Sequence, residues 1–209
     1  QVGDIGHIES NDGDIIHIYD TIKEGNLTVH LCKNLPKKID QIFRAVVDHS
    51  NRYRVQCNHT ATHLLHQALK NILGDHVEQK GSRVSSENFR FDFSHFSKLD
   101  RMDIVAVENF VNSRIENSIH LEENRNVPIK KALESGAIGL FGEKYGDVVR
   151  TIKFGKSYEL CGGTHVKNTS ELWQFKIISE SAIASGIRRV EAITFDDVKN
   201  YYNSKIDEY

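Results

Sequence analysis

The sequence predicts an α+β protein that begins with a small β-rich unit, and two observations support this fold class. Short β-prone runs follow one another closely over residues 1–57, a spacing typical of a small barrel or sandwich. From Asn58 onward, helical and strand-like patterns interleave irregularly, which indicates an α+β arrangement in the second part.

The N-terminal unit contains runs of β-branched and aromatic residues at positions 5–8, 15–19, 27–31 and 42–47. Residues 11–14 read Asn-Asp-Gly-Asp, which is a hairpin turn signal between the first two runs. We therefore expect closely spaced strands in this unit.

In the second part, Asn58 is a good N-cap, and apolar residues then recur with helical spacing until Gly74 ends the pattern. The remaining predicted elements are strands at 81–84 and 88–93, a helix from 100 to about 121, a short helix opened by Pro128, a glycine-punctuated loop at 136–146, strands at 148–154, 173–178 and 188–194, and a polar helix from Asp196.

The composition is that of an ordinary globular protein, with 39% hydrophobic and 27% charged residues. No run of about 18 apolar residues occurs, so we expect no membrane span. The odd number of cysteines (Cys32, Cys57 and Cys161) favours a reducing compartment, and we expect a cytoplasmic protein. The net charge of −2 gives no overall basic signature for nucleic acid. The missing initiator Met suggests an excised part of a longer chain.

Two separated pairs of residues have the chemistry of zinc ligands. His59 and His63 are four residues apart in the predicted helix, and Cys161 and His165 flank a Gly-Gly pair. Imidazole and thiolate are preferred zinc ligands, and four of them make a tetrahedral set. The paired glycines would let the backbone approach the metal closely.

Alternatives to this ligand set remain open at the level of sequence. Cys57 and His66 flank the first pair and are possible substitutes. Four protein ligands make a closed structural site, whereas catalytic zinc keeps one position open. Thr60 follows His59 where a zinc peptidase helix has glutamate, and no carboxylate stands beside the histidines as an obvious general base.

Several blocks, in order along the chain, resemble the editing domain of alanyl-tRNA synthetase, which also occurs in free-standing Ala-X proteins. The Cys161-Gly162-Gly163-Thr164-His165 motif and the motif Arg188-Arg189-x-Glu191-Ala192 favour the alanyl branch over the related threonyl one. The matching blocks are residues 1–6, 58–66, 76–82, 90–95, 140–146, 159–165 and 185–192. Two positions depart from the pattern: residues 170–173 replace a glycine-containing turn, and Phe195 stands where glycine is common.

The resemblance implies a small N-terminal β-barrel over residues 1–57. An editing domain of the threonyl/alanyl-tRNA synthetase second-additional-domain type would follow over 58–195, and 196–209 would begin a helical connection. It also implies Zn²⁺ held by His59, His63, Cys161 and His165. An aminoacylation domain would lie upstream, and a further domain downstream.

The implied activity is hydrolysis of Ser-tRNA(Ala), and we also expect hydrolysis of Gly-tRNA(Ala), within a parent enzyme that attaches alanine to tRNA(Ala) using ATP. A pocket built for alanine discriminates against serine or glycine by only roughly a hundredfold, so a second, hydrolytic site is needed. The catalytic candidates are Thr60, Gln79 and Cys161. The candidate tRNA contacts are Arg83, Lys144, Arg188 and Arg189. Two alternatives are a non-catalytic tRNA-binding module with structural zinc and a free-standing Ala-X type deacylase.

Overall fold

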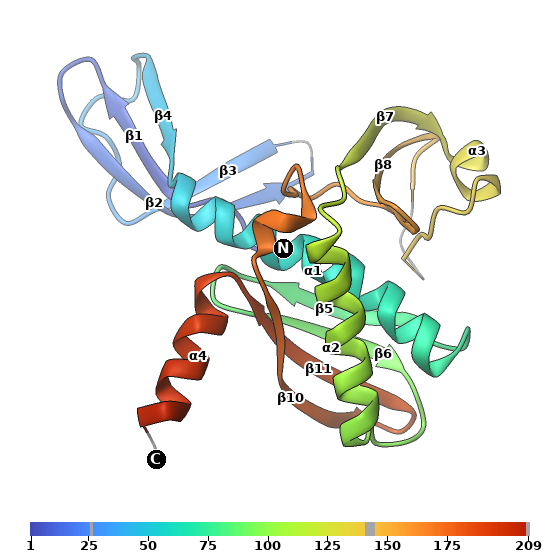
Figure 1. The fold of residues 1–209 in the computed structure, drawn as a ribbon. Helices are drawn as coiled ribbons and strands as arrows, with labels where there is room; N and C mark the ends of the chain where they lie inside the picture. The colour runs from blue at the N-terminus through green and yellow to red at the C-terminus, as the bar shows by residue number, and fades with distance from the viewer. Residues whose placement is uncertain (26, 141–144, 208–209) are drawn as a thin grey trace.

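The computed structural model describes residues 1–25, 27–140 and 145–207, and Figure 1 shows their arrangement. Three antiparallel sheets surround one long central helix, α1. The helices are α1 (His49–Leu73), α2 (Arg101–Glu116), α3 (Ile129–Glu134), α4 (Asp196–Asp207) and the 3₁₀ helix η1 (Thr169–Leu172). The strands are β1 (Gly6–Ser10), β2 (Ile15–Glu24), β3 (Leu27–Cys32), β4 (Phe43–Val47), β5 (Gln79–Val84), β6 (Phe89–Ser94), β7 (Glu122–Pro128), β8 (Val148–Phe154), β9 (Ser157–Leu160), β10 (Phe175–Ala184) and β11 (Ile187–Thr194).

The N-terminal unit is a four-stranded sheet in the order β3-β2-β1-β4. The predicted strands and the hairpin between β1 and β2 are confirmed, because these strands pair antiparallel across residues 11–14. The predicted barrel is not confirmed: β3 and β4 are the outer strands, and no pairing between them closes the sheet within the described residues.

The central helix α1 begins ten residues earlier than the sequence pattern predicts, with its N-cap at position 48 instead of 58. Its N-cap is Asp48, whose side chain accepts a hydrogen bond from the backbone N–H of Asn51. The first turns carry polar residues and therefore show no apolar periodicity; Arg54, for example, is paired with Asp197 of α4. The expected N-cap, Asn58, lies buried inside the helix and donates to the carbonyl of Ser85 instead. The predicted end at Gly74 is confirmed.

The second sheet has the order β10-β11-β6-β5, and α1 and α2 cover one of its faces (Figure 1). Strand β6 shows the expected alternation: Phe89, Phe91 and Phe93 are fully buried, whereas the intervening Arg90 and Asp92 are partly exposed on the other face. The buried phenylalanines pack with apolar residues of α1 and α2 in the main core. This packing fixes the helix that carries His59 and His63.

The third sheet, β7-β8-β9, positions the second ligand pair because β9 leads directly into Cys161. Strand β8 has the predicted bounds, but β7 and β9 are absent from the prediction. Strand β7 is almost entirely polar and exposed, so it carries no alternating apolar signal. Helix α2 ends at Glu116 rather than near residue 121, because Ser118 turns out of the helix with a φ of 50°.

The two positions that depart from the related editing domains both have left-handed backbone angles. Trp173 has a φ of 58° and Phe195 a φ of 57°. At Trp173 the N–H of Gln174 donates to the carbonyl of Leu172, which makes a strained γ-turn centred on a tryptophan. Glycine adopts such angles without a Cβ penalty, whereas tryptophan and phenylalanine do not.

The predicted short helix after Pro128 and the polar helix from Asp196 are both confirmed, as α3 and α4. Within the part of the chain that is described, no helix is both long enough and apolar enough to cross a bilayer.

Candidate metal centre

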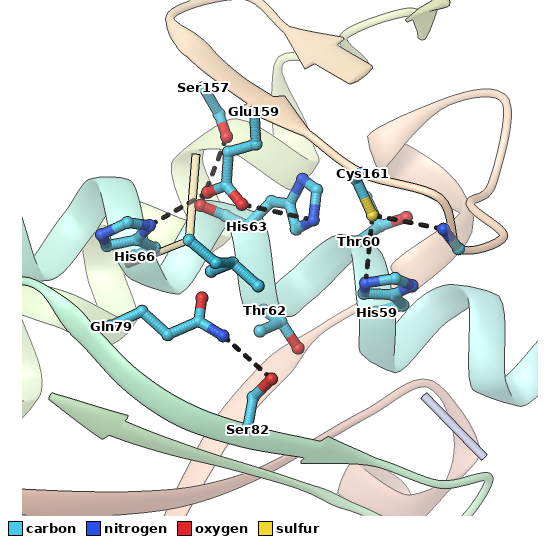
Figure 2. Close-up of polar contacts among 12 residues, drawn as sticks. His59, Thr60, Thr62, His63, His66, Gln79, Ser82, Ser157, Glu159 and Cys161 are labelled. Atoms are coloured by element: carbon cyan, nitrogen blue, oxygen red, sulfur yellow. Dashed lines mark hydrogen bonds and ion pairs between the residues drawn. The ribbon is translucent and has the colours of Figure 1, made fainter. Parts of the chain in front are cut away.

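The four predicted zinc ligands come together in the structure. His59 and His63 lie on α1, Cys161 follows β9, and His165 lies in the loop beyond it. One ligand atom from each of the four side chains lies within 4.8 Å of all the others. The Sγ atom of Cys161 is 3.5 Å from Nε2 of His59 and 3.3 Å from Nε2 of His165. The two sequence-distant pairs therefore form one cluster. Figure 2 labels His59, His63 and Cys161 of this cluster.

These separations suit a tetrahedral ion. Zinc bonds of roughly 2.0–2.3 Å place neighbouring ligand atoms about 3.3–3.8 Å apart in a tetrahedron. The distances from Cys161 to His59 and His165 fall within that interval, and the other ligand atoms lie within 4.8 Å of one another. A further observation is that Nδ1 of His63 is buried with no hydrogen-bond partner. The donor set and the spacing therefore fit Zn²⁺.

Of the two glycines in the loop between Cys161 and His165, only Gly163 is closely packed against another residue. A Cβ atom at Gly163 would overlap the ring of His59, so glycine is required there. A Cβ at Gly162 would meet nothing within 4 Å. The expectation that both glycines permit close approach is confirmed for Gly163 and is wrong for Gly162.

Arg150 of β8 holds this loop in place. Its guanidinium group donates to the carbonyl oxygens of Cys161 at 3.0 Å and Gly163 at 2.5 Å. Its Nε also donates to the carboxylate of Glu123 on β7 at 2.9 Å. Arg150 therefore connects the edge of the third sheet to the ligand loop.

The outer nitrogens of two histidines have partners that direct the inner nitrogens toward Cys161. Nδ1 of His59 lies 2.8 Å from Oε1 of Gln1, and Nδ1 of His165 lies 3.1 Å from Oγ1 of Thr60. Zinc-ligating histidines commonly donate the second ring N–H to such an oxygen. Thr60, one of the three catalytic candidates, is fully buried and is positioned to orient His165.

A buried carboxylate lies beside the cluster, contrary to the sequence analysis. Glu159 is only 6% exposed, and its oxygens lie 3.4 Å from Nε2 of His63 and 3.1 Å from Nδ1 of His66 (Figure 2). The absence of a neighbouring acid was inferred from residues near the histidines in sequence. Strand alternation is the signal that was missed: Glu159 lies in β9 and precedes Cys161, which directly follows the strand, by two residues, the spacing at which side chains of an extended chain share a side.

Burial sets the electrostatics of the cluster. Burial holds the pKa values of His59 and His165 well below the usual range, and the neighbouring His63 lowers them further. Burial also raises the pKa of the Cys161 thiol to about 11 in the metal-free protein. For Glu159, burial raises the pKa, but the adjacent His63 and His66 outweigh it and the net shift is downward. Burial therefore favours the neutral form of His59 and His165, which is the form that binds a metal.

The two possible substitute ligands are engaged elsewhere. Cys57 is buried, and its Sγ lies 3.7 Å from the carbonyl of Glu171. His66 is paired with Glu159. Neither belongs to the cluster of His59, His63, Cys161 and His165.

Gln79 lines a cleft of about 250 Å³ that also includes His66 and residues 138–140. Its side-chain amide donates to Oγ of Ser82 at 3.0 Å, as drawn in Figure 2. Through His66 and Glu159, the cleft is connected to the ligand His63 by direct contacts.

The predicted tRNA contacts have different surroundings. Arg83 is exposed on β5, directly opposite Arg90 of β6. Arg188 pairs with Glu180, and Arg189 makes a two-pronged pair with Asp92 at 2.6 and 2.8 Å. Lys144 lies outside the described residues. The structure thus leaves Arg83 as the most accessible guanidinium group of the three that are described.

Comparisons with known proteins support the resemblance derived from the sequence. Residues 149–191 match the family described as "Threonyl and Alanyl tRNA synthetase second additional domain". The chain is 57% identical over 205 residues to an alanine–tRNA ligase of Christiangramia forsetii. It is 54% identical over 213 residues to that of Flavobacterium psychrophilum and 49% identical over 207 residues to that of Porphyromonas gingivalis.

These alignments cover 98–99% of this chain but only 24% of each relative. The chain therefore spans about a quarter of the length of the curated relatives that it matches. The predicted resemblance to an editing-domain segment of alanyl-tRNA synthetase is confirmed.

Proposed function

We propose that this chain is the proofreading part of an alanine–tRNA ligase. It would hydrolyse the ester of Ser-tRNA(Ala), and that of Gly-tRNA(Ala), to free amino acid and tRNA. The observation that carries the proposal is the convergence of His59, His63, Cys161 and His165 in a chain so similar to a segment of alanine–tRNA ligases.

The chain's residues would divide the work as follows. His59, His63, Cys161 and His165 would hold Zn²⁺, which when bound supplies a Lewis acid that orients or polarises the substrate. Thr60 would keep His165 in its ligating orientation, and Glu159 would do the same for His63. Because four protein ligands make a closed set, a direct contact of the metal with water or with the substrate would require an expanded or exchanged coordination shell. We propose substrate positioning as its role.

Selection of serine over alanine requires a contact to the serine hydroxyl. Gln79 is our candidate because its amide both donates and accepts hydrogen bonds, and it lines the cleft that begins at His66. Alanine offers no hydroxyl to such a group, so it would lack the contact that selects serine. Glycine also lacks the hydroxyl, so hydrolysis of Gly-tRNA(Ala) does not test this contact.

The similarity to alanine–tRNA ligases is also the basis of our proposals about the parent protein. The parent enzyme would attach alanine to tRNA(Ala) using ATP, in the cytoplasm, with further domains on either side of this segment. The small net charge of this chain implies modest affinity for tRNA(Ala) on its own.

The test is a deacylation assay on zinc-loaded protein with Ser-tRNA(Ala) and Ala-tRNA(Ala) in parallel. The proposal expects rapid loss of the seryl ester and retention of the alanyl ester. If both esters persist while the protein still binds tRNA(Ala), the chain is instead a non-catalytic tRNA-binding module with a structural metal.

A further inference from the structure

A second cleft, of about 400 Å³, lies beside the glycine loop, on the surface between β7, β8 and residues 162–164. The charged side chains among its lining residues are Arg125 of β7 and Arg150 of β8. Neither arginine was among the predicted tRNA contacts. A polar cleft lined only by cationic charges next to the candidate metal centre is suited to an anion.

The two guanidinium groups share one carboxylate. Nε of Arg125 lies 2.6 Å from Oε1 of Glu123, and Nε of Arg150 lies 2.9 Å from the same oxygen. These three groups together carry a net charge of +1. Arg125 remains 74% exposed, and its hydrogen bond to Glu123 uses only Nε. Its terminal nitrogens are therefore available for a planar, two-pronged contact with an oxyanion.

The backbone around the cleft is also arranged to admit a ligand. Strand β7 has an irregularity between Asn124 and Val127, and Asn126 there has a φ of 57°. On the opposite wall, Gly162 is exposed, and its missing side chain leaves open space. Close packing requires no glycine at 162, so the benefit of glycine there is an unobstructed cleft.

We infer that this cleft binds a phosphodiester of the acceptor end of the aminoacylated RNA, through Arg125 with Arg150. The inference rests on the proposed function, because an ester held at the metal centre belongs to the terminal nucleotide. The nearest phosphodiester is attached to the same nucleotide and must lie close to the ligand loop. Arg150 contacts the carbonyls of Cys161 and Gly163, which places the cleft directly against that loop.

Phosphate contacts position nucleic acids, and a guanidinium group is suited to them because its paired N–H donors match phosphate oxygens. The cleft would therefore fix the register of the RNA 3′ end relative to the metal centre. Arg83 lies on the second sheet and does not line this cleft.

Arg125→Ala is the informative variant because Arg125 is exposed, whereas Arg150 also holds the ligand loop. Two substrates distinguish a loss of phosphate binding from a loss of ester hydrolysis. They are Ser-tRNA(Ala) and seryl-adenosine, which carries the same ester without any phosphate. The matched control is Arg101→Ala. Arg101 is exposed and is the first residue of α2. It lies at the end of that helix that is farther from β7, and the helix is about 24 Å long.

We expect Arg125→Ala to raise KM for Ser-tRNA(Ala) about tenfold or more, with kcat less affected. The loss in kcat/KM should be at least about tenfold larger for Ser-tRNA(Ala) than for seryl-adenosine.

The salt dependence of log(kcat/KM) should lose about one unit of slope, and Arg125→Lys should restore part of the affinity. The dissociation constant for uncharged tRNA(Ala), measured by fluorescence anisotropy, should rise in parallel. Arg101→Ala should match wild type in all these measurements.

Equal losses on the two substrates, or unchanged KM and tRNA affinity in Arg125→Ala, would overturn the phosphodiester site while leaving the deacylase proposal intact. Failure of wild-type protein to hydrolyse either substrate contradicts the proposed function itself. In that case the tRNA affinity of Arg125→Ala still decides whether the cleft binds RNA.

Discussion

The carboxylate of Glu159 lies 3.4 Å from Nε2 of His63, and both groups are buried. The other Glu159 oxygen contacts His66, one helical turn further along α1. A single acid therefore orients a candidate zinc ligand and, through His66, the wall of the cleft that contains Gln79. The metal centre and the candidate serine-recognition cleft are thus joined by two direct contacts.

Replacing this acid should weaken metal binding. We expect Glu159→Gln to lower zinc affinity roughly tenfold to a hundredfold, because loss of a partner that orients a ligating histidine has that effect. The measurement is competition with a chromophoric chelator. Glu122→Gln, an exposed glutamate on β7, is the control and should bind zinc like wild type. Equal affinities for Glu159→Gln and wild type would remove Glu159 from the metal centre.

The two loop glycines provide a matched pair of variants. Gly163→Ala places a methyl group into the ring of His59, so zinc content after dialysis should fall markedly. Gly162→Ala adds the same methyl group in open space, and zinc content should stay near that of wild type. Atomic emission on both purified variants checks this. Similar zinc contents in the two would mean that the loop packs differently from the structure.

Glycine should relieve the strained turn at Trp173, which has a φ of 58°. Trp173 is 54% exposed, so its replacement removes little buried apolar surface. We expect Trp173→Gly to raise the free energy of unfolding by about 1 kcal/mol through relief of backbone strain. Urea titration measures the change. A lower stability would show that packing of the indole outweighs the strain.

The pair formed by Glu123 and Arg150 predicts a dependence of stability on pH. Hydrogen bonds from Arg150 and Arg125 lower the pKa of Glu123 to about 2, from an unperturbed value of 4.5. Because the folded-state pKa is depressed, the stabilisation is present above pH 4.5 and is lost as pH falls toward 2.

Glu123→Gln should therefore be less stable than wild type near neutral pH, and the difference should shrink between pH 4.5 and 2. Urea midpoints measured across this range provide the comparison. A difference in stability between Glu123→Gln and wild type that stays constant down to pH 2 would contradict the assignment of this stabilisation to the ionised Glu123 carboxylate.

Most strands and helices followed from local patterns, since residues such as Phe89, Phe91 and Phe93 alternate visibly and Gly74 marks a helix end. The start of α1 did not, because its first turns are stabilised by capping at Asp48 and an ion pair at Arg54 rather than by an apolar stripe. Strand β7 is almost entirely polar and is positioned by its pairing with β8. Pairing of that kind leaves no trace in local sequence.

The ligand set was predicted because cysteine and histidine carry their chemistry in the residue type itself. The supporting residues were missed for a different reason. Gln1, Glu159 and Arg150 are ordinary polar residues whose roles depend on which segments the fold brings together. Only the alternation of Glu159 with Cys161 along β9 could have indicated one of them.

The most direct test of the central claim compares Ser-tRNA(Ala) hydrolysis by zinc-loaded wild type, Cys161→Ala and Cys32→Ala. Cys32 lies in the N-terminal sheet, away from the ligand set, and serves as the control. We predict that Cys161→Ala stays folded but loses most of its zinc and nearly all deacylation, whereas Cys32→Ala matches wild type. Wild-type rates in Cys161→Ala would contradict a metal centre that takes part in hydrolysis.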